Sequence, residues 1–190
     1  MDADRRELLK QAAALIAGIT LARCKPEAGP GKEQAELAAA PDAATKAAQP
    51  AQPIEHAFQG PQRATLEATC SRLLPSDQDP GAKEANAIEY IDRELARPEY
   101  EKLKKVILAG TVALDRISAR LGGRKFVQLN GDEQDDVIDT VQKQSERGRD
   151  FVKLMTLLTI EGFVSDPQYG GNARGVGWDF IGYGPGRHEH

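Results

Sequence analysis

Two pairs of side chains in this chain have a spacing that suggests chemistry. Asp77 and Asp79 stand two apart in a loop, and His188 and His190 stand two apart at the end of the sequence. An EF-hand calcium loop needs further acids at fixed offsets and a closing glutamate, and these do not follow Asp77 and Asp79. We interpret the two aspartates as turn and cap residues and the two histidines as part of an exposed tail.

The remaining reactive residue types are scattered. His56 stands alone in a Pro-rich stretch, and Cys24 and Cys70 form neither a CxxC pair nor a CxxCH haem site. A disulfide between the two cysteines and a buried Cys70 are the alternatives for them. No P-loop and no GxGxxG after a strand are present. We therefore expect no catalytic, cofactor-binding or metal-binding residues in this chain.

Composition excludes one class of partner and indicates the architecture. Charged residues make up 28% of the chain and its net charge is −4, so we expect no nucleic-acid partner. Apolar residues recur at helical spacing, and no segment alternates long enough for a strand. The pattern predicts an all-α domain of about five helices over residues 61–183. The expected helices are 65–74, 83–96, one from Pro98 to Gly122, one opening at 132–136, and one after Gly148 that follows Asp150.

Particular residues are assigned to these helices. We expect the third helix to turn a core face inward, Gly122 and Gly123 to end it, and Gly148 to interrupt the pattern before the last helix. The last helix is apolar on most sides, which predicts a central position. The five acids of 132–139 are interpreted as helix N-terminal residues. The core face of the third helix comprises Leu103, Val106, Ile107, Gly110, Leu114, Ile117 and Leu121.

The N-terminus is typical of an export signal. Arg5 and Arg6, followed by Leu8, Leu9 and Lys10, match the twin-arginine pattern, which directs folded cargo to the Tat translocase. An apolar run of about eleven residues follows, too short to span a bilayer. The alternative is a cytosolic N-terminal helix. We assign residues 1–24 to the signal, which is cleaved, retained, or lipidated at Cys24. Residues 25–60 form a flexible Pro/Ala-rich linker, and 184–190 a disordered tail.

Glycines and aromatic residues crowd the segment after the last helix. Glycines permit unusual backbone conformations, and aromatic side chains supply a large contact area at low entropic cost. The pattern predicts a surface that another protein recognises; the alternative is a segment folded back on its own helices. The candidate interface residues are Phe163, Asp166, Pro167, Tyr169, Gly170, Gly171, Asn172, Gly177, Trp178 and Tyr183.

Several of these segments together resemble a known family, gluconate 2-dehydrogenase subunit 3. The resemblance covers residues 61–183 and the twin-arginine leader. Its motifs are LEATCSRLLPSD at 66–77, DPGA at 79–82, YIDREL at 90–95, EGF at 161–163, DP at 166–167, YGGN at 169–172, GW at 177–178 and IG at 181–182. The N-terminal linker is longer and richer in Pro and Ala than this family leads us to expect.

The resemblance implies a non-catalytic partner of a periplasmic, FAD-dependent GMC-type dehydrogenase for gluconate or a related sugar. It also implies that FAD is bound by the flavoprotein and haem c by a cytochrome c subunit. The small subunit would carry the Tat signal for the flavoprotein. The complex would be membrane-associated. A second hypothesis is a stand-alone exported or membrane-tethered helical binding domain. A third is an enzyme that uses Asp77, Asp79 or the terminal histidines.

Overall fold

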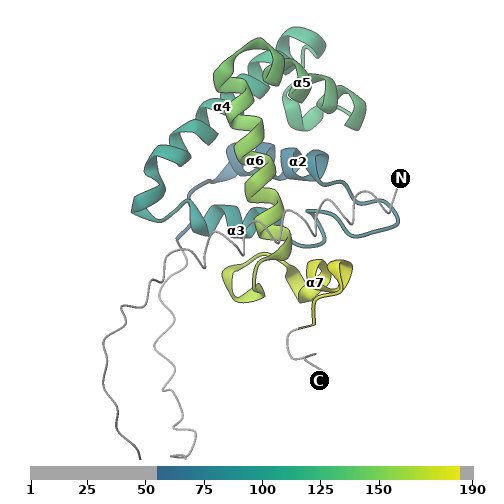
Figure 1. The fold of residues 1–190 in the computed structure, drawn as a ribbon. Coiled ribbons are helices and arrows are strands. Elements are labelled where there is room, and N and C mark those ends of the chain that lie inside the picture. Colours follow the sequence, from purple (N-terminus) through teal and green to yellow (C-terminus); the bar gives the residue numbers. More distant parts are fainter. Residues whose placement is uncertain (1–54, 185–190) are drawn as a thin grey trace, which may run out of the picture.

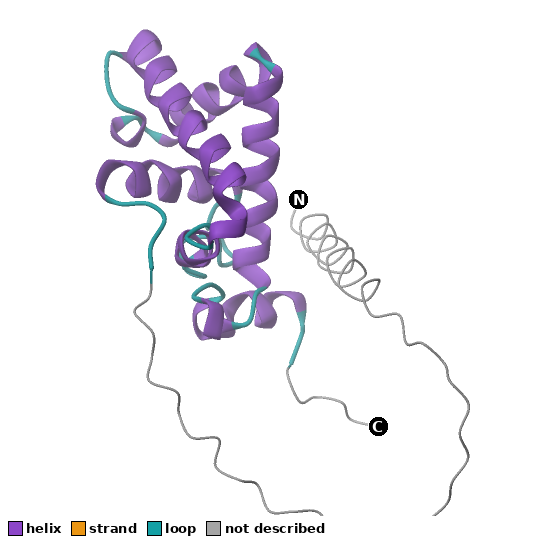
Figure 2. Ribbon diagram, turned by 90° about the vertical axis from the view of Figure 1, so that its left-hand side faces the viewer, coloured by secondary structure: helices purple, strands orange, loops and turns teal. Residues whose placement is uncertain are grey.

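A computed structural model describes residues 55–184, and this range consists of helices and connecting loops with no strand (Figure 2). The predicted all-α class is confirmed. The signal, most of the linker and the terminal histidines lie outside the described residues. The α-helices are α2 (Gly60–Leu73), α3 (Ala87–Glu94), α4 (Glu101–Gly122), α5 (Gly131–Gln144), α6 (Glu146–Val164) and α7 (Val176–Ile181), with short 3₁₀ turns η1 (Pro98–Tyr100), η2 (Phe126–Gln128), η3 (Pro167–Tyr169) and η4 (Ala173–Gly175).

Helix α6 is the axis of the domain. It contacts α2, α3, α4, α5 and α7, and Figure 1 shows it running between α5 at one end and α7 at the other. The predicted central position is therefore confirmed. Its composition explains this arrangement, because a helix that is apolar on most sides must bury several faces at once.

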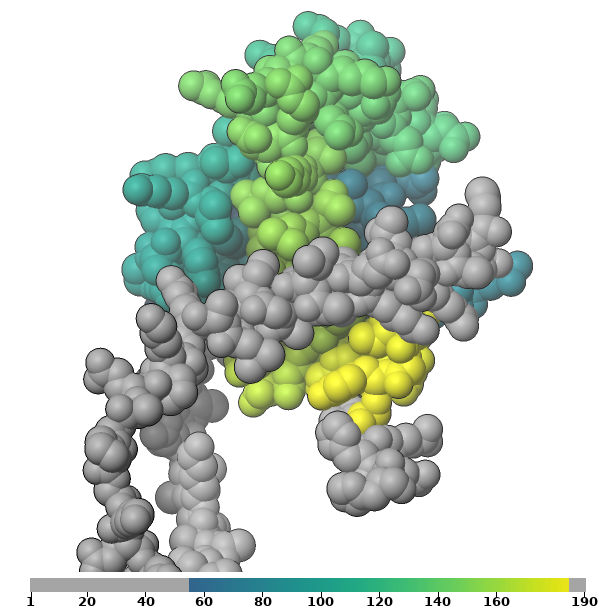
Figure 3. Space-filling model, in the orientation of Figure 1, coloured from purple at the N-terminus to yellow at the C-terminus, as the bar shows by residue number. Residues whose placement is uncertain are grey.

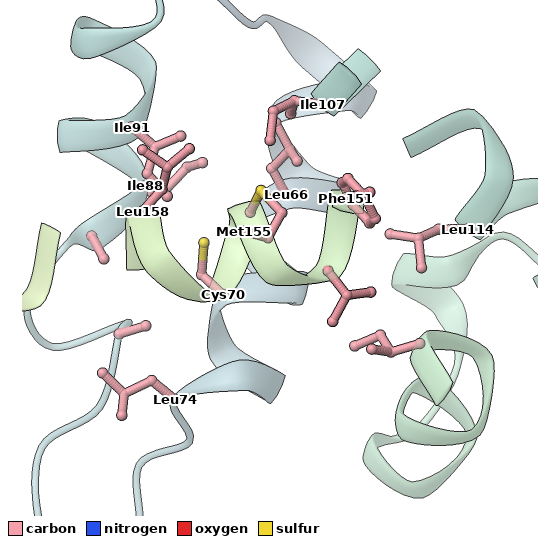
Figure 4. Packing of buried hydrophobic residues seen from close by; sticks show 14 of the residues in the cluster. Leu66, Cys70, Leu74, Ile88, Ile91, Ile107, Leu114, Phe151, Met155 and Leu158 are labelled. Carbon is pink, nitrogen blue, oxygen red and sulfur yellow. The ribbon is translucent and has the colours of Figure 1, made fainter. Parts of the chain in front are cut away.

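The core forms where α2, α3 and α4 meet α6. Leu66 and Cys70 of α2 lie beside Met155 of α6, and Ile91 of α3 lies next to Leu158 (Figure 4). These side chains are almost completely buried. Gly110 of α4 allows a close approach, because a Cβ there would lie 2.0 Å from the ring of Phe151. The helices therefore share one contiguous core.

Helix α4 ends as predicted, but two of its residues were assigned wrongly to the core. Gly123 adopts a left-handed conformation with φ of 63° directly after the helix. Val106 and Leu121 are 37% and 60% exposed, although periodicity assigned both to the buried face. The buried face of α4 is narrower than the apolar stripe of this helix, because other described helices pack against only part of α4.

Among the acids of 132–139, Glu133 and Asp135 have structural roles at the start of α5, as expected. The Oδ1 atom of Asn130 accepts a hydrogen bond from the Glu133 N–H at 3.0 Å, and a Glu133 carboxylate oxygen accepts one from the Asn130 N–H at 2.8 Å. This capping box satisfies backbone donors at the helix start. Asp135 pairs with Arg72 of α2. The acidic cluster thus begins a helix and ties it to a neighbour.

Helix α2 begins at Gly60, before the expected residue 65, and the starts of α3 and α6 also differ from the prediction. Helix α3 begins at Ala87 rather than near residue 83, because Asn86 takes a left-handed conformation with φ of 52°. Helix α6 begins at Glu146, so Gly148 lies in its first turn and does not break the pattern. The Ser145 hydroxyl accepts a hydrogen bond from the Gly148 N–H at 3.0 Å. Gly148 is required there because a Cβ would lie 1.9 Å from the Val141 carbonyl oxygen.

Candidate partner-binding surface

The Gly- and aromatic-rich segment folds into a compact unit below the end of α6. Turns η3 and η4 lead from Val164 to the short helix α7, and Figure 1 shows this unit in yellow-green and yellow beyond the C-terminal end of α6. The candidate interface residues between 163 and 183 are therefore brought together in one region. Their side chains divide into buried and exposed groups with different roles.

Asn172 is the fixed point of this unit. It is completely buried, with a left-handed φ of 46°. Its N–H donates to the Gly162 carbonyl oxygen at 2.8 Å and its Nδ2 donates to the Ser165 carbonyl oxygen at 2.9 Å. Its Oδ1 accepts from the Gly177 N–H at 2.7 Å. Since the last carbonyls of a helix lack intrahelical partners, Asn172 both ends α6 and holds the start of α7.

The aromatic side chains continue this attachment. Phe163 is completely buried and meets Phe180 edge to face, with ring centroids 5.8 Å apart. The Trp178 Nε1–H donates to the Val164 carbonyl oxygen at 2.8 Å, and the indole packs edge to face with Tyr183 at 5.5 Å. Such pairs stabilise beyond the area that they bury. Phe163 and Phe180 thus belong to the core of the domain.

The glycines permit the close packing of this unit. A Cβ on Gly171 would lie 2.2 Å from the Gly162 carbonyl oxygen, and one on Gly177 would lie 1.8 Å from the Phe163 carbonyl oxygen. Gly170 has φ of 102°, a conformation that side chains disfavour. Gly171 and Gly177 are therefore needed because α7 and its lead-in lie directly against the backbone of α6.

A smaller set of the candidate residues faces solvent. Tyr169 is 56% exposed and Tyr183 is 54% exposed. Asp166 and Pro167 are also exposed, and the Asp166 carboxylate accepts a hydrogen bond from the Gln168 N–H at 3.0 Å. Trp178 is partly exposed. Of the candidate interface, these five side chains are the ones that a docking protein can reach, and we call them the aromatic rim.

Sequence reasoning missed a second cluster, centred on Asp92 of α3. This carboxylate is completely buried, and its Oδ1 accepts a hydrogen bond from the Phe58 N–H at 2.7 Å. Its Oδ2 pairs with the Arg63 guanidinium and lies 2.8 Å from His56 Nδ1. Phe58 is only 1% exposed. The packed region thus begins before residue 61, and His56, which the sequence placed alone in the linker, contacts α3.

The same cluster has the composition of a metal site but already contains a cation. His56, Glu89 and Asp92 each offer a ligand atom, and these atoms lie within 4.8 Å of one another. Arg63 reaches both carboxylates, with its Nη2 3.0 Å from Glu89 Oε2. Burial raises the pKa of Glu89, but hydrogen bonds from Arg93 and Arg63 outweigh it and leave the pKa lowered. A buried carboxylate needs a partner charge, and Arg63 supplies it.

The other residue pairs with possible chemistry have structural roles. The Asp79 N–H donates to the Asp77 carboxylate at 2.9 Å, which is the expected turn. Cys70 is a buried free thiol, and burial raises its pKa to about 12. A thiol of that pKa is a poor nucleophile at neutral pH because little thiolate forms. The His188–His190 pair, Cys24 and the twin arginines lie outside the described residues.

Comparison with known proteins identifies the family. The family model described as gluconate 2-dehydrogenase subunit 3 matches residues 61–186, well over half of the chain. The chain belongs to the gluconate 2-dehydrogenase subunit 3 family. No curated protein and no solved structure matches it. The matched range contains every described α-helix except the first residue of α2, so this helical domain is the subunit 3 domain. The resemblance inferred from the sequence motifs is confirmed.

Membership of the gluconate 2-dehydrogenase subunit 3 family is consistent with an accessory role in a dehydrogenase complex. Within residues 55–184, none of the helices combines the length and apolar character needed to cross a membrane.

Proposed function

We propose that this chain is the accessory subunit of a periplasmic FAD-dependent dehydrogenase complex. It binds and stabilises a GMC-type flavoprotein that oxidises gluconate or a related sugar, and a cytochrome c subunit receives the electrons. FAD and haem c are held by those partners and none by this chain. The family match is the observation that carries the proposal, because a subunit family implies a catalytic partner.

The geometry supports a contact surface at the aromatic rim. Two tyrosines lie more than half exposed on a unit that hydrogen bonds from Asn172 and Trp178 fix to α6. Rigid exposed aromatic side chains are the residue type that dominates binding energy at protein interfaces, since little entropy is lost when they are covered. We infer that Tyr169 and Tyr183 contact the flavoprotein, with Asp166 and Pro167 beside them.

Co-purification tests this proposal directly. The affinity-tagged full chain is expressed in its native host, and flavin absorbance is measured in the eluate. We expect the double variant Tyr169→Ala/Tyr183→Ala to recover at least about tenfold less flavoprotein, because two interface aromatics are lost. Leu121→Ala, which also truncates an exposed apolar residue, is the matched control. Absence of a flavoprotein beside the unchanged chain would instead support a stand-alone binding domain.

Export of the complex is a separate part of the proposal. Arg5 and Arg6 match a signal for folded cargo, so a flavoprotein bound in the cytoplasm would be carried into the periplasm with this chain. We expect Arg5→Lys/Arg6→Lys to retain both proteins in the cytoplasmic fraction. A flavoprotein that still reaches the periplasm in this variant would show that it is exported independently.

A further inference from the structure

A cleft opens between α4 and the corner where α5 leads into α6. Its volume is about 460 Å³, and Figure 3 shows the teal surface of α4 beside the green surface of the α5–α6 end of the domain. Apolar and small side chains make up much of its lining. The lining includes Val106, Ala109 and Ala113 of α4, and the charged side chains at its border include Lys105, Arg116 and Arg147.

The floor of the cleft suits close approach by another helix. Ile117 and Phe151 are buried behind it, while Ala109 and Ala113 leave room above them. Val106 is 37% exposed at this site. Its helical spacing is that of a core residue, so the cleft contains a part of the apolar stripe of α4 that the described residues 55–184 do not cover.

The charges around the floor are mostly positive. Lys105, Arg116 and Arg147 line the cleft with one carboxylate, Asp150. Among the described ion pairs, Arg116 and Arg147 have none, and Lys105 has only the loose contact of 3.6 Å with exposed Glu101. The whole chain has a net charge of −4, so this cationic border is local. It favours an occupant that brings acidic groups to the edges of an apolar face.

We propose that this cleft binds an acidic amphipathic helix of the catalytic flavoprotein subunit. The helix places apolar side chains at i, i+3 and i+4 over Val106, Ala109 and Ala113, and its carboxylates meet Arg116 and Arg147. Helix-in-groove recognition uses this spacing, because those positions share one helix face. The inference rests on the proposed function and adds a second contact, formed by α4 and distinct from the aromatic rim.

Binding measurements with the purified flavoprotein subunit test the cleft. Val106→Asp places a carboxylate on the apolar floor, and Arg116→Glu reverses a border charge. We expect each to weaken binding at least about tenfold, since an unpaired charge or a like-charge contact is then buried. Val112→Asp is the matched control, because Val112 lies on the same helix, is 66% exposed and does not line the cleft. All three positions are solvent-accessible, so melting temperatures should change little.

A photo-crosslink identifies the occupant. Benzoylphenylalanine replaces Val106 in the full chain within the native complex, and the linked peptides are sequenced by mass spectrometry. We expect an acidic, amphipathic helical peptide of the flavoprotein. Crosslinks to a second copy of this chain, or to its own residues 1–54, would overturn the proposal in favour of those occupants.

The outcomes separate this inference from the proposed function. If flavoprotein co-purifies but Val106→Asp and Arg116→Glu bind it as tightly as Val112→Asp does, the cleft is not a docking site and the accessory role stands. If the unchanged chain recovers no flavoprotein, the proposed function and the cleft inference fail together.

Discussion

The backbone of Gly177 packs directly on the carbonyl group of Phe163, so closely that a Cβ at position 177 would lie 1.8 Å from the Phe163 oxygen. This contact brings α7 against the last turn of α6. It also allows the Gly177 N–H to reach Asn172 Oδ1 at 2.7 Å. Gly171 and Gly177 are therefore packing residues, which allow the unit that carries the aromatic rim to lie directly against α6.

Gly177→Ala tests this contact. The added methyl group must displace backbone, so we expect a loss of about 2–4 kcal/mol in the free energy of unfolding, measured by chemical denaturation. Gly182→Ala is the control, because Gly182 has φ of 73° but no atom within 4 Å of the place that the new methyl group would occupy. That variant should lose only about 1 kcal/mol, from backbone conformation. Equal losses would mean that the close contact has no energetic role.

Asn172→Gly removes the side-chain bonds of Asn172 and keeps its left-handed backbone accessible. The Gly177 N–H and the Ser165 carbonyl then lose their partners, and we expect destabilisation by about 2–3 kcal/mol. Hydrogen exchange should accelerate at the amides of α7 before those of α4. An exchange pattern unchanged in α7 would contradict the role of Asn172 as its attachment point.

Asp92→Asn tests the attachment of residues 55–59 to α3. One carboxylate oxygen of Asp92 accepts from the Phe58 N–H, and the other pairs with Arg63 and His56. Asparagine has only one oxygen, so its NH₂ group must face one of these donors. Breaking a buried charged network costs about 3–5 kcal/mol. We also expect a protease to cleave the variant near Phe58 faster than it cleaves the unchanged chain, because residues 55–59 would no longer be held against α3. Asp135→Asn, which breaks the exposed pair with Arg72, should cost less than about 1 kcal/mol.

Glu161→Gln tests a pH-dependent contribution. Burial and the nearby Glu94 raise the pKa of Glu161 above 4.5. A raised carboxyl pKa means that the folded state disfavours the charged form. Its contribution to stability is therefore fully present below pH 4.5 and is lost as pH rises through the folded-state pKa. We expect the variant to melt at a higher temperature than the unchanged chain at about pH 7, with the difference vanishing toward about pH 4.

The matched control for this pH series is Glu67→Gln on the exposed face of α2. It removes one carboxylate from the surface, so it reports the general effect of losing one negative charge. The raised pKa of Glu161 would be contradicted if Glu161→Gln melted below the unchanged chain at neutral pH and if this deficit disappeared in acid.

Thiol labelling tests the burial of Cys70. A pKa of about 12 and an exposure of 2% predict that Cys70 reacts with a disulfide reagent at mildly alkaline pH only after unfolding. The Cys24→Ser variant leaves Cys70 as the only thiol in the chain, so all labelling then reports on Cys70. Labelling of this variant should be complete in denaturant and slower by at least about 100-fold without it, because reaction then requires opening of the core. Rapid labelling of the folded protein would show that α2 opens locally.

Local pattern accounts for much of the fold. The apolar spacing of α2 and α5, the glycines after α4 and the turn at Asp77 and Asp79 each appear in the sequence, because helix faces, helix ends and turns depend on neighbours within a few residues. The start of α6 could not be predicted that way. A glycine usually weakens a helix, but Gly148 lies in the first turn of α6 because the Val141 carbonyl oxygen leaves no space there for a side chain.

The C-terminal segment shows the same division within one short stretch. The sequence by itself determined that Gly171, Gly177, Trp178 and the neighbouring aromatics form an ordered unit, and its motifs determined the family. Only the tertiary structure decided which side chains face inward, because Phe163 and Asn172 are buried by segments that meet them through long-range hydrogen bonds and ring contacts. It also brought Asp92 to His56 and left Val106 uncovered, since burial depends on distant neighbours and not on periodicity alone.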